Sequence, residues 1–206
     1  NVSHYELMRD LNRQWRQWTI DQPAVFITFN GMAYDEELVR RQFYWNLFES
    51  YLTNTNGNGR LDILLMMNNI AAFSSDVLNI PLFNGGPGVS LKQADIAEAN
   101  GIEIGDAHDA IADCKLMIGL LEKINATKPE LIDFFLSIST KSGVQAAVQQ
   151  PGFLALGEVF RREIFKYPVV PCGSKAPNDL MFFDLSFDPD EIFEMDTQEI
   201  YSLVQK

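Results

Sequence analysis

The sequence has few of the residues that build disulfide frameworks, zinc sites or membrane spans. It contains two cysteines and two histidines among 206 residues, and Cys114 and Cys172 are not spaced as metal-binding cysteines are. They are interpreted as reduced thiols of a cytosolic protein. No apolar run approaches the roughly 20 residues of a membrane span, and no secretory signal opens the chain. Because the first residue is not Met, we expect the natural protein to start elsewhere.

Basic residues are also scarce. The chain has 16 Lys and Arg against 28 Asp and Glu, a net charge of −12. A protein that wraps nucleic acid usually presents a basic face, so this balance taken alone argues against one. The acidic excess is sharpest over residues 179–199, a stretch that nucleic acid should avoid. Most local basic clusters are solvated helix faces. Three such clusters occur: Arg9, Arg13 and Arg16; Arg40 and Arg41; Arg161, Arg162 and Lys166.

Patterns of helix and strand alternate over the first two thirds of the chain. Apolar spacing predicts a helix over residues 4–18, and the run AVFITF at 24–29 is typical of a buried strand. After an Asn30-Gly31 turn, a helix is predicted over 35–52. Further helices are predicted over 61–72, from Ser90 to 99, over 107–124 and over 128–139.

Two details of these helices are specific enough to test. Ser90 with Gln93 three residues later matches a capping box, which predicts a helix start at Ser90. In the helix over 107–124, the residues expected to face the core form an apolar stripe: Ile111, Cys114, Ile118 and Leu121.

The pattern of residues along the chain changes near residue 150. Short apolar runs lie between Pro and Gly residues there, and residues 181–187 alternate as a strand does. With a last helix near 198–204, this tail is interpreted as a small β-rich module.

The segment HDAIAD at residues 108–113 carries the clearest chemical signal. A His of near-neutral pKa can take a proton from water, and Asp113 offers the hard oxygen that Mg²⁺ or Mn²⁺ prefers. Five helical residues turn the chain by about 140°, so both side chains reach one site only if His108 precedes the regular helix. The alternative is a helix start with ordinary acids and a surface histidine.

A second signal follows the predicted strand at 24–29. Asn30 and Tyr34 lead to Asp35 just past the end of that strand, and ligand sites of α/β sheets gather at such ends. The alternative is that Asp35 is an N-terminal helix acid favoured by the helix dipole.

Together and in this order, the two segments resemble the exonuclease I family of bacterial DEDD nucleases, in the subclass with a catalytic His. Tyr34-Asp35 matches the aromatic residue and third acid of the family, and residues 108–113 match its His-Asp-Ala-x-x-Asp motif. Residues 60–64, 90–91, 99–103 and 128–134 resemble other family stretches, so the resemblance covers nearly the whole chain.

The resemblance implies an α/β fold: a ribonuclease H-like exonuclease domain at 1–147, with a mixed sheet flanked by helices, then an SH3-like β-barrel module at 148–206. It implies a cytoplasmic enzyme that removes nucleotides from the 3′ end of single-stranded DNA with two Mg²⁺ or Mn²⁺ ions, in repair and recombination. Its partners would be that DNA end and a single-strand-binding protein, with no membrane, and the complete protein would be a monomer.

The same resemblance implies the roles of individual residues. Asp35 and Asp113 would hold metal, and His108 would be the general base. Arg40, Asn30 and Tyr34 would contact DNA, although Arg40 also fits an exposed helix charge.

One departure from the family is serious. The Asp-x-Glu motif of the first strand is absent, since Asp35-x-Glu37 already serves as the third acidic position. We therefore expect a fragment that lacks the first strands and the family's helical C-terminal domain, leaves an apolar sheet edge uncovered, and is weakly active or inactive alone. Two alternatives stay open: a related RNA 3′-end exonuclease, and a non-catalytic module that binds single strands or a partner. Such a module would stack bases on aromatic residues; the candidates are Tyr34, Phe43, Tyr44 and Trp45.

Overall fold

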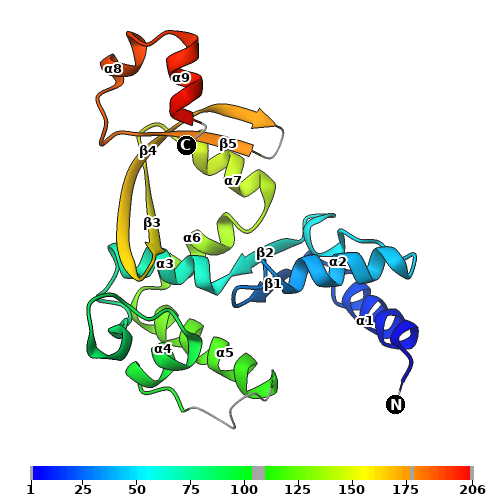
Figure 1. Ribbon diagram of the computed structural model, residues 1–206. Coiled ribbons are helices and arrows are strands. Elements are labelled where there is room, and N and C mark those ends of the chain that lie inside the picture. Colours follow the sequence, from blue (N-terminus) through cyan, green and yellow to red (C-terminus); the bar gives the residue numbers. More distant parts are fainter. Residues whose placement is uncertain (1, 104–109, 177–178, 205–206) are drawn as a thin grey trace. The chain divides into compact units, whose positions relative to one another are not determined.

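The computed structural model of the chain describes residues 2–103, 110–176 and 179–204. It is a mixed α/β structure, as the sequence predicted, and it divides into two compact units (Figure 1). The first unit is residues 1–149 together with 157–165, and the second is residues 150–156 together with 166–206. Within the described ranges, no helix combines the length and apolar character that a membrane span needs.

Helix α1 (His4–Trp18) opens the first unit and matches its predicted range. In a capping box, the Ser3 hydroxyl accepts from the Glu6 backbone N–H and the Glu6 carboxylate accepts from the Ser3 backbone N–H, so both N–H groups are satisfied. The Trp15 ring lies 5.0 Å from the Phe26 ring and 5.6 Å from the Phe43 ring, between centroids. These contacts attach the helix to the strand and helix that follow.

Two short parallel strands form the sheet of the first unit. Strand β1 (Val25–Thr28) pairs with β2 (Gly59–Asp62), with Val25 opposite Gly59 and Thr28 opposite Asp62. The prediction that β1 is buried was wrong, because Val25 and Ile27 are each 37% exposed. Among the described residues, no strand pairs with the edge of β1 that faces away from β2.

Two predicted helices have different bounds in the structure. Helix α2 (Asp35–Trp45) ends well before residue 52, because Leu47 adopts a left-handed φ of 60° that stops the helix. A short 3₁₀ turn, η1 (Leu52–Asn54), follows. Helix α3 (Ile63–Phe73) starts later than predicted, since the Asp62 side chain caps it by accepting from the Leu64 N–H.

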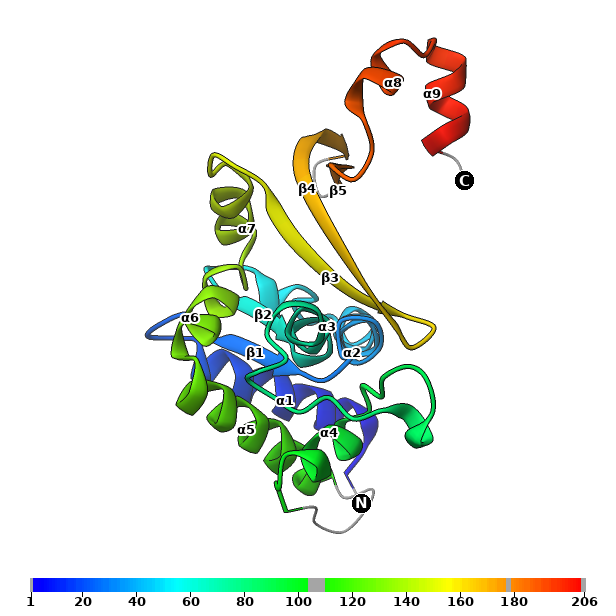
Figure 2. The same cartoon turned by 90° about the vertical axis from the view of Figure 1, so that its left-hand side faces the viewer.

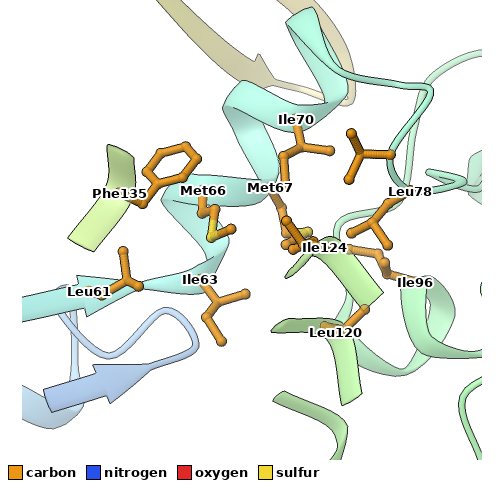
Figure 3. Packing of buried hydrophobic residues seen from close by; sticks show 11 residues of the cluster. Leu61, Ile63, Met66, Met67, Ile70, Leu78, Ile96, Leu120, Ile124 and Phe135 are labelled. Carbon is orange, nitrogen blue, oxygen red and sulfur yellow. The ribbon is translucent and has the colours of Figure 1, made fainter. Parts of the chain in front are cut away.

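The core of the first unit forms around α3 (Figure 3). Four side chains of α3, those of Ile63, Met66, Met67 and Ile70, are at most 1% exposed. They meet apolar side chains from β2, from α4 (Gln93–Ala99), from α5 (Ala110–Thr127) and from α6 (Pro129–Ser137). The other members of this cluster are Leu61, Val77, Leu78, Ile96, Leu120, Ile124 and Phe135. The short helix α7 (Lys141–Val148) follows α6, and the sequence analysis missed it.

The predicted core stripe of α5 was wrong at Ile111, Cys114 and Ile118, which are exposed, whereas Leu121 packs against the core as predicted. The buried residues are Ala112, Leu116, Leu120 and Ile124, four apart, while Ile111 and Ile118 are 64% and 55% exposed. Helix α5 carries apolar residues on two faces, and α4 and α6 cover one of them.

The predicted capping box of α4 was also wrong. The helix begins at Gln93 after Lys92, and the Ser90 hydroxyl instead donates a 2.5 Å hydrogen bond to the Asp95 carboxylate. A 3₁₀ turn, η2 (Phe83–Gly85), lies in the loop before it.

A three-stranded sheet in the order β3-β4-β5 follows, and most of it belongs to the second unit. Strand β3 (Leu154–Phe160) is joined to the long β4 (Glu163–Ala176) by two residues (Figure 2). Strand β5 (Asp179–Asp184) runs antiparallel to β4 with two register shifts, in place of the strand predicted at 181–187. Helices α8 (Pro189–Phe193) and α9 (Thr197–Val204) end the described chain, and α9 matches the predicted last helix.

Candidate active site

The turn between β1 and α2 presents Asp35 at the start of α2. Asn30 has a left-handed φ of 60°, and a Cβ on Gly31 would lie 2.4 Å from the Thr28 Cβ, so only glycine fits there. The Gly31 carbonyl accepts hydrogen bonds from the N–H groups of Tyr34 and Glu36. This turn leaves Asp35 exposed in the first turn of α2, where the helix dipole favours a carboxylate.

The buried carboxylate of Asp62 holds the same turn from the neighbouring strand. It accepts hydrogen bonds from the backbone N–H groups of Asn30, at 2.7 Å, and Met32, at 3.1 Å, besides the one that caps α3. The end of β2 therefore fixes the chain that carries Asn30 and Asp35. Sequence reasoning did not single out Asp62, although an Asp between a strand and a helix is a recognisable capping signal.

A cavity of about 510 Å³ lies against β1 and α2. Its wall includes the whole of β1, the tryptophans Trp15 and Trp18 of α1, and Asp35 at the start of α2. Cys114, the residue after Asp113, also lines it. The structure thus brings the Asp35 segment and the first turns of α5 to one cavity, although the two segments lie far apart in the sequence.

Asp113 itself is exposed on α5, next to the cavity wall rather than in it. The side-chain amide of Gln93 donates a 2.6 Å hydrogen bond to the Asp113 backbone carbonyl, so α4 helps to fix the start of α5. His108 lies outside the described residues. The cysteines Cys114 and Cys172 are both exposed and form no disulfide.

Glu36 is a residue of this cavity that sequence reasoning missed. Its carboxylate is 9% exposed and forms an ion pair with Arg60 of β2, whose guanidinium also donates to the Thr53 hydroxyl at 2.7 and 2.9 Å. Burial raises the pKa of the Glu36 carboxyl, and the nearby Arg60 charge opposes that shift. The spacing of Glu36 with Val39 and Phe43 places it on the buried stripe of α2, which was a readable signal.

Arg40 lies on the wall of the same cavity and is held in place. Its guanidinium pairs with Glu37, which raises the Arg40 pKa, and donates a 3.1 Å hydrogen bond to the Tyr51 hydroxyl. It also lies over the Tyr51 ring, 5.5 Å from the centroid. Arg40 is therefore a partly buried member of a helix ion pair that borders the cavity, and its contact with DNA stays a prediction.

The aromatic candidates for base stacking divide into two groups. Phe43 is 1% exposed and belongs to the core, whereas Tyr34, Tyr44 and Trp45 are 68–71% exposed. Three of the four aromatic rings thus stand on the surface around α2. Asn30 is exposed as well.

Asp35 and Asp113 are candidate ligands of a metal ion, but the described residues contain no assembled metal site. Asp35 and Asp113 offer carboxylate oxygens, the donors that Mg²⁺ and Mn²⁺ prefer. Within the described ranges, however, no three Asp, Glu, His or Cys side chains come together closely enough to hold an ion. A complete two-ion site therefore needs ligands from outside this set.

Comparisons of sequence and of structure both find similarity to exonuclease I proteins. Exodeoxyribonuclease I of Escherichia coli K12 is 26% identical over 180 residues, which are 84% of this chain and 38% of that protein. The exodeoxyribonuclease I of Buchnera aphidicola from Acyrthosiphon pisum is 30% identical over 128 residues, 62% of this chain and 31% of that protein. No protein-family model matches the sequence.

Solved structures give the same result. Exonuclease I of Methylocaldum szegediense superposes with a TM-score of 0.78 at 23% identity, over 97% of this chain and 43% of that one. The E. coli enzyme in complex with a dA16 oligonucleotide gives 0.76 at 22%, over 97% and 43%. The match thus spans 31–43% of the length of these four relatives. The chain is a relative of the exonuclease I family that corresponds to part of the full-length protein.

Proposed function

We propose that this chain is part of a 3′→5′ exonuclease that degrades single-stranded DNA to mononucleotides in repair and recombination. The observation that carries the proposal is the cavity lined by Asp35 and by Cys114, the residue that directly follows the second motif segment. The curated relatives named exodeoxyribonuclease I support the same activity.

In this proposal the residues keep the roles that the sequence suggests. Asp35 and Asp113 supply metal ligands, and His108 takes a proton from the attacking water. Arg40, Asn30 and Tyr34 contact the DNA strand. Bound Mg²⁺ or Mn²⁺ would stabilise charge on the reacting phosphate, but the two carboxylates alone do not make a complete site.

The missing ligands would come from a strand that adds to the free edge of β1. Several apolar side chains that line the cavity are uncovered: Trp18 is 59% exposed, and Val25 and Ile27 are 37% exposed. An open strand edge beside an apolar cavity favours pairing with another strand. We propose that this strand carries the Asp-x-Glu motif and that the chain alone is weakly active or inactive.

The domain assignment and the partners are part of the same proposal. Residues 1–147 would be the ribonuclease H-like exonuclease domain, and residues 148–206 an SH3-like module, which the order β3-β4-β5 supports. Related structures hold E. coli exonuclease I with dA16 and dT13 oligonucleotides, and an ExoI/SSB-Ct complex is known. We propose single-stranded DNA and a single-strand-binding protein as the partners, in the cytoplasm.

A second function, binding of single strands without cleavage, is favoured by the small number of acidic side chains that could hold a metal ion. With no metal cluster among the described residues, a module that binds single strands without cleaving them is the alternative. The exposed rings of Tyr34, Tyr44 and Trp45 would then stack on bases.

The test is release of mononucleotides from 3′-labelled single-stranded DNA with Mn²⁺. Four proteins are compared: this chain, a form extended by an upstream strand with Asp-x-Glu, and that form with His108→Ala or with His4→Ala. His4 is the matched control, since it is the second histidine and contacts Asn46 on α2. Activity of the extended form that is lost with His108→Ala and kept with His4→Ala is the expected result. A folded, inactive extended form that still binds DNA would overturn the nuclease in favour of the binding module.

A further inference from the structure

The turn between β3 and β4 contains two arginines in an unfavourable backbone conformation. Arg161 and Arg162 are its two central residues, with φ values of 50° and 75°. Two-residue hairpin turns with positive φ at both positions strongly favour Asn-Gly, because a side chain is strained there. Two long cationic side chains in such a turn therefore need an explanation beyond closing the hairpin.

The turn belongs to the first unit and is fixed there by close contacts. The backbone N–H of Gly157 donates to the Asn69 side-chain oxygen at 2.9 Å, and that of Val159 donates to Asn68 at 2.6 Å. The Arg162 carbonyl accepts from the Val89 N–H at 2.8 Å. In Figure 2 this yellow tip lies beside the green loop that contains η2. These hydrogen bonds hold the backbone of the two arginines in place.

Aromatic rings hold both guanidinium groups. The Arg162 guanidinium carbon lies 3.4 Å from the centroid of the Phe83 ring, and that of Arg161 lies 5.3 Å from the Phe160 ring. Stacking on a ring restrains a guanidinium while its N–H donors stay available. A Cβ on Gly88 would lie 2.7 Å from the Arg162 Cβ, so the loop fits closely around this side chain.

The pair also differs from the other basic clusters in its charge partners. On α1, Arg9 and Arg13 pair with Asp10 and Arg16 pairs with Glu49. On α2, Glu37 pairs with both arginines. Within the described part of the chain, neither Arg161 nor Arg162 forms an ion pair with a carboxylate. On a protein of net charge −12, they are a restrained cationic pair without internal neutralisation.

We propose that Arg161 and Arg162 form a phosphate-binding contact for the backbone of single-stranded DNA. This inference rests on the proposed function, because it names where the strand meets the protein away from the cavity. Arg donors match phosphate oxygens in two-point contacts, and a preorganised pair loses little freedom on binding. The contact adds affinity and no base specificity.

The test is binding of a fluorescein-labelled dT oligonucleotide by this chain in EDTA, followed by anisotropy over a range of salt concentrations. The double variant Arg161→Asn, Arg162→Gly keeps the turn shape and removes both charges. We expect about tenfold weaker binding and a salt slope smaller by about 1.4, since each single-strand phosphate contributes about 0.7. Arg161→Gln alone, which leaves the Arg162–Phe83 contact intact, should lose about half of that slope.

A matched control removes the same net charge elsewhere. Arg9→Gln with Arg13→Gln on α1 should change the affinity little; an equal loss in this control would show a net-charge effect and overturn the proposal. Unchanged binding by the two hairpin variants, with normal binding by the parent chain, would also overturn it and leave the proposed nuclease untouched. If the parent chain binds no DNA, the proposed phosphate contact fails, and the nuclease is still decided by the extended form. If the variants lose binding but the extended protein never cleaves, the nuclease alone fails.

Discussion

The Asp62 carboxylate accepts a 2.7 Å hydrogen bond from the backbone N–H of Asn30, so the end of β2 fixes the turn that follows β1. The same carboxylate is 3% exposed and also accepts from two other backbone N–H groups. A buried carboxylate with three such donors is both a helix cap and the support of the chain that presents Asp35. The candidate site thus depends on a residue with no direct chemical role.

Asp62→Ala should therefore destabilise the protein and disturb the site. It leaves buried N–H groups unpaired, and each hydrogen bond to a charged group contributes about 1.5–3 kcal/mol. We expect a loss of roughly 2–4 kcal/mol in the free energy of unfolding, measured by urea denaturation. Asp62→Asn keeps an acceptor and should lose less. Equal effects of both variants would contradict the role of the carboxylate oxygens.

Glu36→Gln should make the protein more stable at neutral pH. Burial raises the pKa of Glu36 in the folded protein, so the ionised side chain is less favourable there than in the unfolded chain. In the wild type this cost disappears when the carboxyl becomes protonated, which happens as the pH falls through the raised folded pKa toward the ordinary value of 4.5. The stability difference between variant and wild type should thus be largest above the folded pKa and shrink in acid.

Urea denaturation at several pH values between 4 and 8 gives that difference. Glu49→Gln is a suitable control, since Glu49 also pairs with an arginine but at the surface. A stability difference for Glu36→Gln that does not change with pH would rule out the buried carboxylate as its cause.

The parts of the fold that the sequence predicted are those fixed by local patterns. Helix α1 has a regular apolar spacing, and the turn predicted at Asn30 is present, with Asn30 at a left-handed φ. Strand β2 could not be predicted from Gly59–Asp62, because these four residues show no alternation and are a strand only through pairing with β1.

The wrong helix predictions also concern contacts between segments that lie far apart in the sequence. Helix α5 is apolar on two faces, and the sequence cannot say which face meets α4 and α6. The charge partner of the buried Glu36 on α2 is Arg60, which comes from strand β2. The site residues stay predictions from the motifs, while the contact of Asp62 with the Asn30 turn and the pairing of Arg60 with Glu36 required the three-dimensional structure.

Gly157→Ala should weaken the packing of the β3–β4 hairpin against α3. A Cβ there would lie 2.6 Å from the Ala72 Cβ and 2.9 Å from the Asn68 carbonyl oxygen. Overpacking of this kind costs roughly 1–3 kcal/mol, measured as the loss of unfolding free energy in urea. Gly86→Ala is the control, because its Cβ would meet only the Phe83 oxygen, at 3.5 Å. Similar losses in both variants would contradict a specific contact at Gly157.

Cys114 can report whether a strand occupies the cavity beside β1. Its thiol is exposed and its residue lines the cavity, whereas Cys172 is exposed on β4. In this chain both thiols should react readily with a disulfide reagent such as Ellman's reagent. In the form extended by the Asp-x-Glu strand, the reaction of Cys114 should slow at least several-fold while that of Cys172 stays the same. Measured in Cys172→Ser and Cys114→Ser variants, the two rates are separate. An unchanged Cys114 rate in the folded extended form would mean that the added strand does not fill the cavity, and the proposed completion of the site at the β1 edge would then be wrong.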